Sequence, residues 1–560
     1  MSLLYKFLDR YEFDSYEDMK DNFHIKIPEN FNFAYDVVDV LAEQSPDKTA
    51  LIWCDDNGGE KIISFSEMKQ YSERAAACFR DLGINRGDAV MLILKGRYEF
   101  WFCLLGLHRI GAIAIPATHM LTDGDIEYRV KSADIKMVVS IDNEELMGHI
   151  DKAQERCDSL LAEKAFVGNC SNRQGWTDMG AAIENAPSGF KRPSGADAVS
   201  NDDILLLYFT SGTTGFPKMV QHNYTYPLGH ILTAGYWQNV KDGGLHYTVA
   251  DTGWAKAVWG KIYGQWICGS SVFVYDYEIF NPHKMLEKIQ KYGITTFCAP
   301  PTVYRFLINE DLSGYDLSSL KYCVVAGEPL NPEVYDKFLS HTGIRLMEGY
   351  GQTELTVTIA TYPWMDPKPG SMGKPSPGYS ILLINTDGNP CEEGEEGEIV
   401  LDVSSCKPVG MFDGYFRDSK KTVETWHDNL YYTGDMAWMD EDGFLWFVGR
   451  ADDVIKSSGY KIGPFEVENA LMQHPSVLEC AITAVPDPVR GQVVKATILL
   501  KKDFTASDDL KKNIQDHVKQ ITAPYKYPRI IEFVDELPKT ISGKIRRVEI
   551  RDRDTSDNPE

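Results

Sequence analysis

The sequence has no pair of cysteines in a CxxC arrangement. Its 560 residues include eleven cysteines, an odd number, which are scattered from Cys54 to Cys480. Such usage is typical of a reducing compartment rather than a disulfide scaffold, and it argues against a structural zinc site. No two histidines have metal-ligand spacing on a plausible helix. We therefore expect neither a disulfide framework nor a zinc centre.

Long apolar stretches are missing as well. The longest apolar run, Phe100–Pro116, is interrupted by His108, Arg109 and glycines, so it predicts a buried helix followed by a strand rather than a membrane span. The first 23 residues are acidic and contain no apolar core, which is not the character of a signal or transit peptide. We therefore expect a cytoplasmic protein.

Positive charge is scarce. The 57 Lys and Arg residues stand against 82 Asp and Glu residues, which gives a net charge of −25. This balance argues against nucleic acid or an anionic membrane surface as the main partner. Small anionic substrates remain compatible with it, because a local basic pocket can lie within an acidic protein.

What is present is the pattern of an α/β protein. From about residue 200, short β-branched runs alternate with helical patterns, which is typical of βαβ units around a buried parallel sheet. Residues 63–145 show the same alternation. The predicted strands after residue 200 are 204–209, 271–276, 294–299, 322–327 and 344–349, and the predicted helices are 282–293, 301–310 and 332–340.

A chain of this length is expected to form two or more domains. The residue pattern changes at two points in the C-terminal part of the sequence. After about residue 370 the sequence is rich in turns, which predicts a β-subdomain; its EEGEEGE stretch, residues 392–398, is most simply a solvated turn. Beyond Gly449–Asp453 the pattern is that of a small α+β domain, with predicted helices 465–474 and 508–520 and strands 478–485, 493–500 and 529–535. We therefore place an N-terminal domain at residues 1–450 and a C-terminal domain at residues 451–560.

The segment YFTSGTTGFPKMV, residues 208–220, has the composition of a phosphate-binding loop. Glycines let the backbone approach an anion, and main-chain N–H groups and hydroxyls supply donors. The order is not that of a Walker loop, GxxxxGK[ST], and Pro217 interrupts the path. A Gly/Ser/Thr run alone is as often a surface loop. The strand before it and Lys218 after it favour the phosphate interpretation.

Six motifs follow one another in an order that identifies a superfamily. They are YFTSGTTGFPKMV (208–220), VVAGEPL (324–330), MEGYGQTE (347–354), YTGD (432–435), GFLWFVGRADDVIKSSGYKIGPFEVE (443–468) and PKTISGKIRR (538–547). The set resembles the adenylate-forming superfamily of acyl-CoA synthetases and firefly-luciferase-like enzymes over nearly the whole chain, and its C-terminal part resembles the medium-chain acyl-CoA synthetases. The resemblance implies stacked mixed or parallel sheets flanked by helices in the large domain, and a mobile small domain.

The resemblance also implies a first half-reaction, in which a carboxylate attacks the α-phosphorus of ATP and expels pyrophosphate. Both reactants are anions, so catalysis consists mainly of charge neutralisation and alignment. Lys544 would bridge the two anions, Glu354 would bind Mg²⁺, and Thr353 would hydrogen-bond the α-phosphate. Asp435 would accept both ribose hydroxyls, supported by Arg450. The likeness assigns the β- and γ-phosphates to Thr210, Ser211, Gly212, Thr213, Thr214, Gly215 and Lys218, and the rest of the nucleotide to Gly327, Glu328, Pro329, Glu348, Gly349, Tyr350, Gly351 and Gln352.

In the second half-reaction the thiol of CoA attacks the acyl-adenylate. The resemblance implies that the C-terminal domain rotates about a hinge at Asp452 and exchanges Lys544 for a thiol channel. Gly459 would let the pantetheine pass close to the backbone. Cations and aromatic rings suit phosphate and adenine, and the candidates for the nucleotide end of CoA are Ser458, Tyr460, Arg490, Tyr525, Lys526 and Tyr527.

The acyl site is expected at ADTGWAKAVWGKIYG, residues 250–264, where the family lines its carboxylate pocket. Lys256 would reach the carboxylate or point to solvent. Gly351 stands where acetate-specific relatives have a tryptophan, so we expect open space there and an acid longer or bulkier than acetate. Three tryptophans would wall an apolar slot, although such spacing is more often plain core: Trp237, Trp254 and Trp259.

The sequence thus predicts an ATP- and Mg²⁺-dependent acyl-CoA synthetase for a medium-chain or branched carboxylic acid. The alternatives are an adenylate ligase that loads a free-standing carrier protein and a short-chain or aromatic-acid CoA ligase. The missing Walker pattern disfavours a kinase-like phosphotransferase, and the presence of both Glu354 and Lys544 disfavours a non-catalytic nucleotide binder. We expect no nucleic-acid partner and no membrane span, with a homodimer as one candidate for the oligomeric state.

Overall fold

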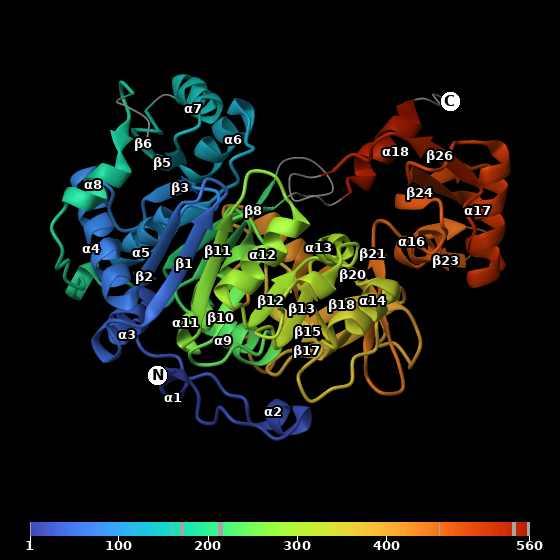
Figure 1. The fold of residues 1–560 in the computed structure, drawn as a ribbon, viewed down its shortest axis with the longest axis horizontal. Coiled ribbons are helices and arrows are strands. Elements are labelled where there is room, and N and C mark those ends of the chain that lie inside the picture. Colours follow the sequence, from blue (N-terminus) through green and yellow to red (C-terminus); the bar gives the residue numbers. More distant parts are fainter. Residues whose placement is uncertain are drawn as a thin grey trace.

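A computed structural model describes residues 2–157, 159–168, 173–210, 217–457, 460–539 and 545–556. The described strands form three sheets of seven, 14 and five strands (Figure 1). The first two lie in the body of the molecule, and the third lies in a smaller unit near the C-terminus. This arrangement confirms the predicted α/β class, with a large N-terminal domain of mixed sheets and a small C-terminal domain.

The seven-stranded sheet has the order β7-β6-β5-β3-β4-β8-β9. Its neighbours pair in parallel, except that β8 and β9 are antiparallel. This last pairing sets Thr210 opposite Lys218, so the two ends of the predicted phosphate loop lie side by side. The strands are β3 Ala89–Ile93, β4 Ile113–Pro116, β5 Ile135–Ile141, β6 Glu163–Val167, β7 Thr177–Asp178, β8 Ile204–Thr210 and β9 Lys218–Asn223.

The 14-stranded sheet combines a parallel and an antiparallel part. The parallel part has the order β14-β13-β12-β10-β11-β1, with β2 antiparallel at its edge. The predicted β-subdomain continues the same sheet, because β15 pairs with both β14 and β16. The strands are β1 Thr49–Asp55, β2 Glu60–Ser64, β10 Leu245–Thr248, β11 Ser271–Asp276, β12 Thr296–Ala299, β13 Tyr322–Ala326, β14 Leu346–Gly351, β15 Val357–Ala360, β16 Ser371–Pro375, β17 Ser380–Ile384, β18 Gly397–Asp402, β19 Trp426–His427, β20 Leu430–Met439 and β21 Leu445–Arg450.

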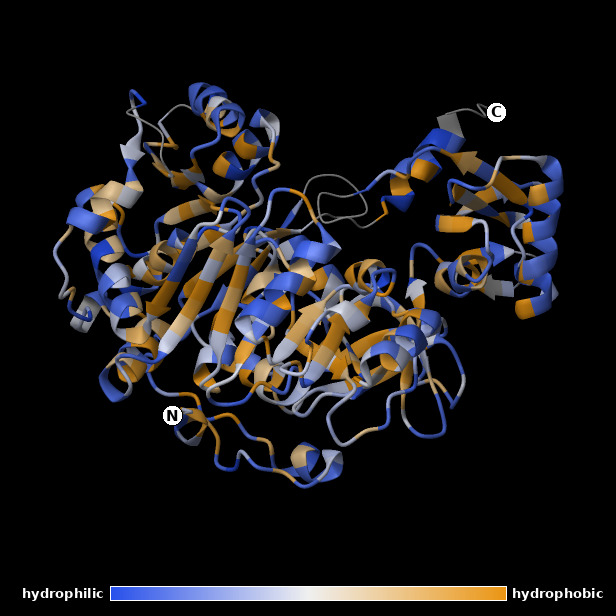
Figure 2. Ribbon diagram, in the orientation of Figure 1, coloured by the Kyte–Doolittle hydropathy of each residue, from blue (hydrophilic) through white to orange (hydrophobic). Residues whose placement is uncertain are grey.

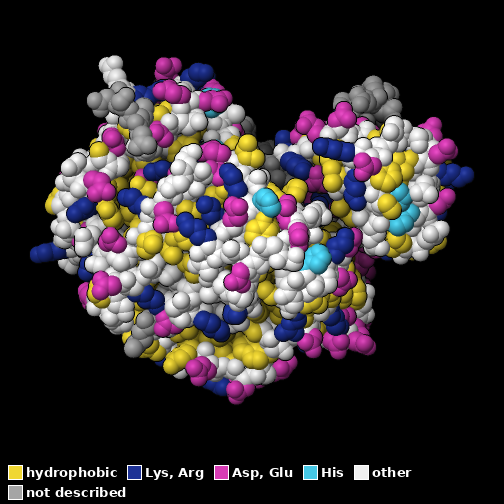
Figure 3. All heavy atoms as spheres, viewed as in Figure 1, with side chains coloured by type: hydrophobic (Ala, Val, Ile, Leu, Met, Phe, Trp, Pro, Cys, Tyr) yellow, Lys and Arg dark blue, Asp and Glu magenta, His cyan; other side chains and the backbone are white. Residues whose placement is uncertain are grey.

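The five-stranded sheet has its own core. Val467, Ile482, Ile498 and Ile514 belong to a buried apolar cluster whose members all lie beyond residue 454. In the space-filling view this unit is the lobe on the right, set off from the main body by a notch (Figure 3). Its strands are β22 Ile455–Ser457, β23 Tyr460–Ile462, β24 Val477–Asp487, β25 Gly491–Leu500 and β26 Ile530–Val534.

Helices pack on the sheets with their apolar sides inward and their polar sides in solvent (Figure 2). Local sequence sets their ends: Ser64 and Glu67 form a capping box at the start of α4, and Gly111 ends α5 with φ 77°. The α-helices are α1 Leu4–Phe7, α2 Tyr16–Asn22, α3 Val40–Gln44, α4 Phe65–Asp81, α5 Glu99–Ile110, α6 Asp123–Ala133, α7 Glu144–Arg156, α8 Met179–Asn185, α9 Tyr226–Ile231, α10 Ala255–Gly260, α11 Tyr263–Ile267, α12 Pro282–Tyr292, α13 Pro301–Leu307, α14 Pro332–Thr342, α15 Ser419–Thr425, α16 Pro464–Met472, α17 Asp508–Ile521 and α18 Arg547–Ser556.

The predicted elements are found with shifted ends. The apolar run Phe100–Pro116 forms the buried helix α5 and strand β4, and no helix in the described ranges is long and apolar enough to cross a membrane. Strand β13 stops one residue early because Gly327 has φ 103°. Strand β14 runs two residues further than predicted, since Gly351 still pairs with Val357 of β15.

Candidate active site

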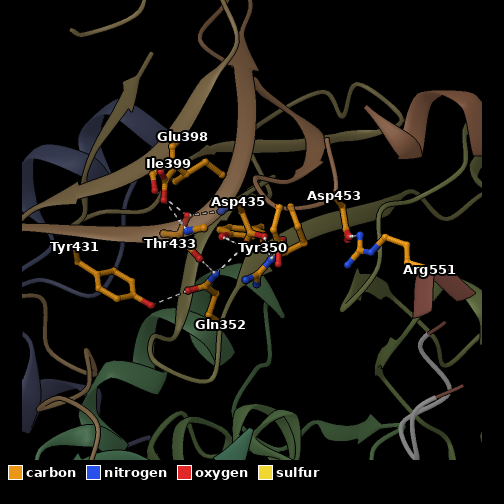
Figure 4. A network of polar contacts seen from close by, with 12 residues as sticks. Tyr350, Gln352, Glu398, Ile399, Tyr431, Thr433, Asp435, Asp453 and Arg551 are labelled. Atoms are coloured by element: carbon orange, nitrogen blue, oxygen red, sulfur yellow. Dashed lines mark hydrogen bonds and ion pairs between the residues drawn. The ribbon is translucent and has the colours of Figure 1, made fainter. Parts of the chain in front are cut away.

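Asp435 lies at the centre of a hydrogen-bond network between strands of the 14-stranded sheet (Figure 4). Its buried Oδ2 accepts hydrogen bonds from Tyr350 Oη and Gln352 Nε2, each at 2.6 Å. Arg450 Nε lies 3.5 Å from Asp435 Oδ1, because the two residues are register partners on β20 and β21. The structure thus brings together four of the residues predicted to bind the nucleotide.

Gln352 is fixed from both ends of its amide. Its Nε2 also donates to the carbonyl oxygen of Thr433 at 2.9 Å, and its Oε1 accepts from Tyr431 Oη at 3.0 Å. The Thr433 hydroxyl in turn accepts from the backbone N–H of Asp435 at 3.1 Å. Tyr431 and Thr433 belong to strand β20, and the sequence analysis did not single them out, although both lie in or next to the YTGD motif.

Glu398 is a further residue of this region that the sequence analysis missed. Its Oε1 accepts from the backbone N–H of Gly434 at 2.9 Å, and burial raises its pKa. The interpretation of EEGEEGE as a solvated turn is therefore wrong for its last two residues, Gly397 and Glu398. Strand β18 begins at Gly397, so Glu398 belongs to the sheet and lies beside Asp435.

The residues predicted around adenine come from two neighbouring strands. Gly327 and Pro329 directly follow β13, whereas Gly349 lies on β14 as the register partner of Ala326. Glu328 accepts a hydrogen bond from Thr302 Oγ1 at 2.9 Å. A loop and a strand end therefore meet on the sheet, with the Tyr350 hydroxyl fixed by Asp435 nearby.

Glu348 is a carboxylic acid buried in this sheet. It is 5% exposed, and its Oε1 accepts from the backbone N–H of Leu330 at 3.1 Å. Its Oε2 is buried and has no hydrogen-bond partner among the described residues. Burial raises the pKa of Glu348 from 4.5 to about 8, against the opposing effect of the Leu330 N–H. The side chain is therefore protonated at neutral pH and ties β14 to the loop after β13.

Glu348 makes the protein less stable as the pH rises. Between its unfolded pKa of 4.5 and its folded pKa of about 8, the folded chain retains a proton that the unfolded chain has lost, so the free energy of unfolding falls across this window. Glu348→Gln cannot ionise, so we expect its stability relative to wild type to rise by about 3 to 4 kcal/mol from pH 5 to pH 8. Thermal melts of both proteins across this range measure the difference, and a constant difference would contradict the assignment.

The predicted metal and phosphate residues meet beside β9. The Oε1 of Glu354 accepts from the hydroxyl of Tyr415 at 2.8 Å, and the ammonium of Lys218 lies 5.1 Å from the centre of the Tyr415 ring. The carbonyl oxygen of Thr353 accepts from Nε2 of His222 at 2.7 Å. Burial lowers the pKa of His222 to about 3, so the ring is neutral with its proton on Nε2. Neither His222 nor Tyr415 follows from the motifs, because both act through contacts distant in sequence.

Glu354 could serve as the single protein ligand of a magnesium ion. One of its oxygens is bound by Tyr415, whereas its Oε2 has no hydrogen bond or ion pair within the described ranges. Those ranges also contain no group of three or more His, Cys, Asp or Glu side chains placed to hold a metal. A single carboxylate plus phosphate oxygens and water is the usual arrangement for Mg²⁺.

The expected open space beside Gly351 is absent. A Cβ atom at Gly351 would lie 2.4 Å from Cη2 of Trp259, and one at Gly349 would lie 2.4 Å from Cε2 of Trp237. Both indoles are buried in the main core and fill the space that the glycines leave. The inference from Gly351 to a longer acid is therefore wrong in its premise, since a tryptophan from another element occupies that position.

The other two acyl-site candidates lie at the start of α10. Trp254 is partly exposed and is the N-cap residue of this helix. The ammonium of Lys256 donates to the carbonyl oxygen of Ala326 at 2.5 Å, which places it at the end of β13 next to Gly327. Lys256 is therefore held at the sheet rather than directed to solvent.

Three of the predicted CoA residues cluster in the C-terminal unit. The rings of Tyr460 and Tyr525 stack with centroids 4.2 Å apart, and Lys526 lies beside them, paired with Glu466 at 2.6 Å. Tyr527 packs elsewhere, between the side chains of Lys519 and Arg529. Arg490 lies at the turn between β24 and β25, 4.0 Å from Asp487.

Several predicted residues lie outside the described residues: Ser211, Gly212, Thr213, Thr214, Gly215, Ser458, Gly459 and Lys544. Their neighbours are placed. Asp452, the predicted hinge, lies 3.7 Å from Arg450 Nε, so Arg450 stands between Asp435 and the hinge residue. Lys539 forms an isolated bridge with Ile545, which brings the two ends of the lysine-bearing segment together.

Comparison with known proteins gives full-length matches. A family model described as "AMP-binding enzyme" matches residues 38–416, and one described as "AMP-binding enzyme C-terminal domain" matches residues 466–544. Acyl-coenzyme A synthetase ACSM3, mitochondrial, of Homo sapiens is 41% identical over 551 residues, which are 97% of this chain and 93% of that protein. ACSM4, mitochondrial, of Rattus norvegicus is 42% identical over 537 residues, 94% and 91% of the two chains.

Solved structures match over a similar length. The anthranilate CoA ligase AuaEII in complex with anthranoyl-AMP has a TM-score of 0.85 at 29% identity, covering 95% of this chain and 98% of that one. A benzoate CoA ligase from Burkholderia xenovorans LB400 has a TM-score of 0.81 at 25% identity, covering 93% and 100%.

Proposed function

The chain belongs to the family of AMP-binding enzymes, and from this premise we propose that it is an AMP-forming acyl-CoA synthetase of the medium-chain type. It activates a carboxylic acid with ATP as acyl-AMP, releases pyrophosphate, and transfers the acyl group to CoA. The substrate proposed is a medium-chain or branched acid. Its full-length likeness to acyl-coenzyme A synthetases supports this function.

One structural observation carries the proposal. Asp435, Tyr350 and Arg450 come from three different strands and meet within hydrogen-bond or ion-pair distance. A carboxylate with two acceptor oxygens suits the vicinal diol of a ribose, and an aromatic ring beside it suits adenine. Glu354 and Lys218 both contact Tyr415 in the same region, and we assign them to the phosphate end of ATP.

In adenylate formation the protein has to hold two anions together. Asp435 binds the ribose and fixes the nucleotide, while Lys218 and the loop from Thr210 hold the β- and γ-phosphates that leave. His222 holds the main-chain carbonyl of Thr353, and the Thr353 hydroxyl is proposed to hydrogen-bond the α-phosphate. Lys544 places its ammonium between the carboxylate and the α-phosphate, where charge develops in the transition state.

We propose that Glu354 would bind Mg²⁺ through its Oε2. When bound, the cation would neutralise negative charge on the phosphate oxygens. Tyr415 fixes the carboxylate by its hydrogen bond to Oε1. The protein's own contribution is thus one oriented oxygen.

For thioester formation we propose that the C-terminal domain, residues 451–560, turns about Asp452. Tyr460, Tyr525 and Lys526 then hold the nucleotide end of CoA, since they present stacked rings and a cation on one surface. Gly459 directly precedes Tyr460 in the sequence and is proposed for the pantetheine path. Ser458, Arg490 and Tyr527 are proposed as further contacts for the nucleotide end of CoA.

A salt bridge connects the hinge region to the helix that follows Lys544. Arg551 of α18 pairs with Asp453, the residue after the proposed hinge (Figure 4). A partly buried pair between Arg547 and Glu468, at 2.7 Å, holds the start of the same helix. Rotation at Asp452 is therefore passed directly to the segment that carries the lysine.

Reversing the charges of this salt bridge tests the connection. We expect Asp453→Arg and Arg551→Asp each to slow adenylate formation by about 10-fold, and the double variant to recover to within about threefold of wild type. The measurement is pyrophosphate release from ATP and acid without CoA. Equal defects in the double and single variants would show that the loss does not come from breaking this salt bridge.

The function is tested by supplying ATP, Mg²⁺ and a panel of acids, and by measuring pyrophosphate and AMP with and without CoA. The panel should hold straight acids from acetate upward, branched acids, and benzoate and anthranilate, because two similar structures are CoA ligases for aromatic acids. Release of ADP and inorganic phosphate would overturn the proposal. Adenylate formation without acyl transfer to CoA would favour the carrier-protein alternative.

The compartment is a separate question. The cytoplasmic localisation stays a prediction, whereas the ACSM relatives are named as mitochondrial. Fractionation of cells that contain the tagged protein distinguishes the two compartments.

A further inference from the structure

Tyr415 lies between two side chains of opposite charge. Its hydroxyl donates to Glu354 Oε1 at 2.8 Å, and the ammonium of Lys218 lies 5.1 Å from its ring centroid. Tyr415 is 5% exposed, so the phenol is a fixed part of the interior rather than a surface group. One side chain therefore contacts a carboxylate through its hydroxyl and an ammonium through its ring.

The backbone around Tyr415 is fixed to the strand that carries Lys218. Tyr415 forms an isolated antiparallel bridge with Val220 of β9. The neighbouring backbone hydrogen bonds are Phe416 N to Met219 O (2.8 Å), Gln221 N to Gly414 O (3.2 Å) and Asp413 N to Gln221 O (2.9 Å). The backbone N–H of Phe412 also donates to the carbonyl oxygen of Glu354 at 2.8 Å. The segment 412–416 thus connects β9 to the residue proposed to bind the metal.

Lys218 and Glu354 do not form an ion pair. No carboxylate oxygen of the described residues lies within 4.0 Å of the Lys218 ammonium, although Glu354 is near enough to oppose the lowering of the Lys218 pKa by burial. Two opposite charges at this range attract strongly when they are half-buried. Direct pairing would neutralise both groups, so neither would be available to a phosphate or a divalent cation.

We infer that Tyr415 is a positioning residue that keeps Lys218 and Glu354 apart and orients the Glu354 carboxylate. Its ring lies next to the Lys218 ammonium, and its hydroxyl binds Oε1 of Glu354, which leaves Oε2 for a cation. Lys218 then remains available to an anion. The inference rests on the proposed function, because that function assigns the anion to ATP phosphates and the cation to Mg²⁺.

The test measures the binding of Mn²⁺, a spectroscopically visible divalent cation, to the full chain with a non-hydrolysable ATP analogue. Free Mn²⁺ is followed by electron paramagnetic resonance. We expect Tyr415→Leu to weaken Mn²⁺ binding by about 10-fold, because Lys218 then pairs with Glu354. Tyr415→Phe keeps the ring and should weaken it by about threefold. Tyr379→Leu, at another buried tyrosine, controls for the loss of a large side chain.

A second substitution separates positioning from packing. If Lys218 captures Glu354 in Tyr415→Leu, then Tyr415→Leu should weaken Mn²⁺ binding much less in a Lys218→Met background than in the wild-type background, a comparison that cancels the direct effect of Lys218 on the nucleotide. A purely structural role for Tyr415 gives the same loss in both backgrounds. Wild-type affinity in folded Tyr415→Leu, or an equal loss in both backgrounds, would overturn the inference. Release of AMP and pyrophosphate by the wild type decides the proposed function separately, because that assay does not depend on Tyr415.

Should Tyr415→Leu unfold, Tyr415→Phe carries the test. Unchanged Mn²⁺ binding in that variant would then show that the hydroxyl does not orient Glu354.

Discussion

Replacing Asp435 with alanine is expected to weaken ATP binding by about 10³-fold. Each hydrogen bond from a ribose hydroxyl to an ionised carboxylate contributes about 1.5 to 3 kcal/mol, and the proposed pose has two of them. The substitution also removes the acceptor of the Tyr350 hydroxyl and one of the two acceptors of the Gln352 amide. The loss should appear in the binding of ATP, measured by calorimetry, and in KM for ATP.

A nucleotide that lacks one ribose hydroxyl tests whether Asp435 acts on the ribose. Wild type should prefer ATP to 2′-deoxy-ATP, and Asp435→Ala should lose most of that preference because the carboxylate that reads the diol is gone. Glu398→Gln is the matched control, since Glu398 lies beside Asp435 and, within the part of the chain that the structure describes, its side chain accepts from the N–H of Gly434 alone. An Asp435→Ala protein that still discriminates as well as wild type would place the ribose elsewhere.

Much of the fold follows from local patterns. Alternating apolar strands and helices predict the parallel sheets, because buried parallel strands must be apolar on both faces. The continuity of the 14-stranded sheet does not follow, since it depends on β15 pairing with β14 and β16 rather than on the composition of any strand. The ends of β13 and β14 likewise depend on Gly327 and on pairing with Val357.

Some residues of the candidate site could likewise be predicted from the sequence, and others could not. Asp435, Tyr350 and Glu354 could be predicted from the sequence, because each lies in a short motif whose residue types suit the binding of a nucleotide. His222 is not found, since it acts on the Thr353 carbonyl across 131 residues, and Tyr415 acts on Glu354 across 61. Such partners become visible only when the fold brings the segments together. The prediction of open space beside Gly351 is wrong for the same reason, because Trp259 from another element fills that space.

Replacing Lys544 with alanine is expected to slow adenylate formation by about 10²- to 10³-fold, the usual cost of removing one group that stabilises a developing charge. The lysine is proposed to act only in the transition state between carboxylate and α-phosphate, so KM for ATP should change little. Thioester formation from supplied acyl-adenylate and CoA should stay within about threefold of wild type, since the proposed rotation moves Lys544 away for that step. Single-turnover assays of the two half-reactions measure this split.

Lys539→Ala is the matched control for that experiment. Lys539 lies in the same PKTISGK motif, five positions before Lys544, and its ammonium pairs with Glu479 at 2.8 Å on β24. Removing it changes the net charge by the same amount without removing the proposed catalytic group, so adenylate formation should remain near the wild-type rate. Equal losses in both half-reactions of Lys544→Ala would refute domain alternation. A comparable loss in Lys539→Ala would mean that the segment, rather than the one ammonium, supports catalysis.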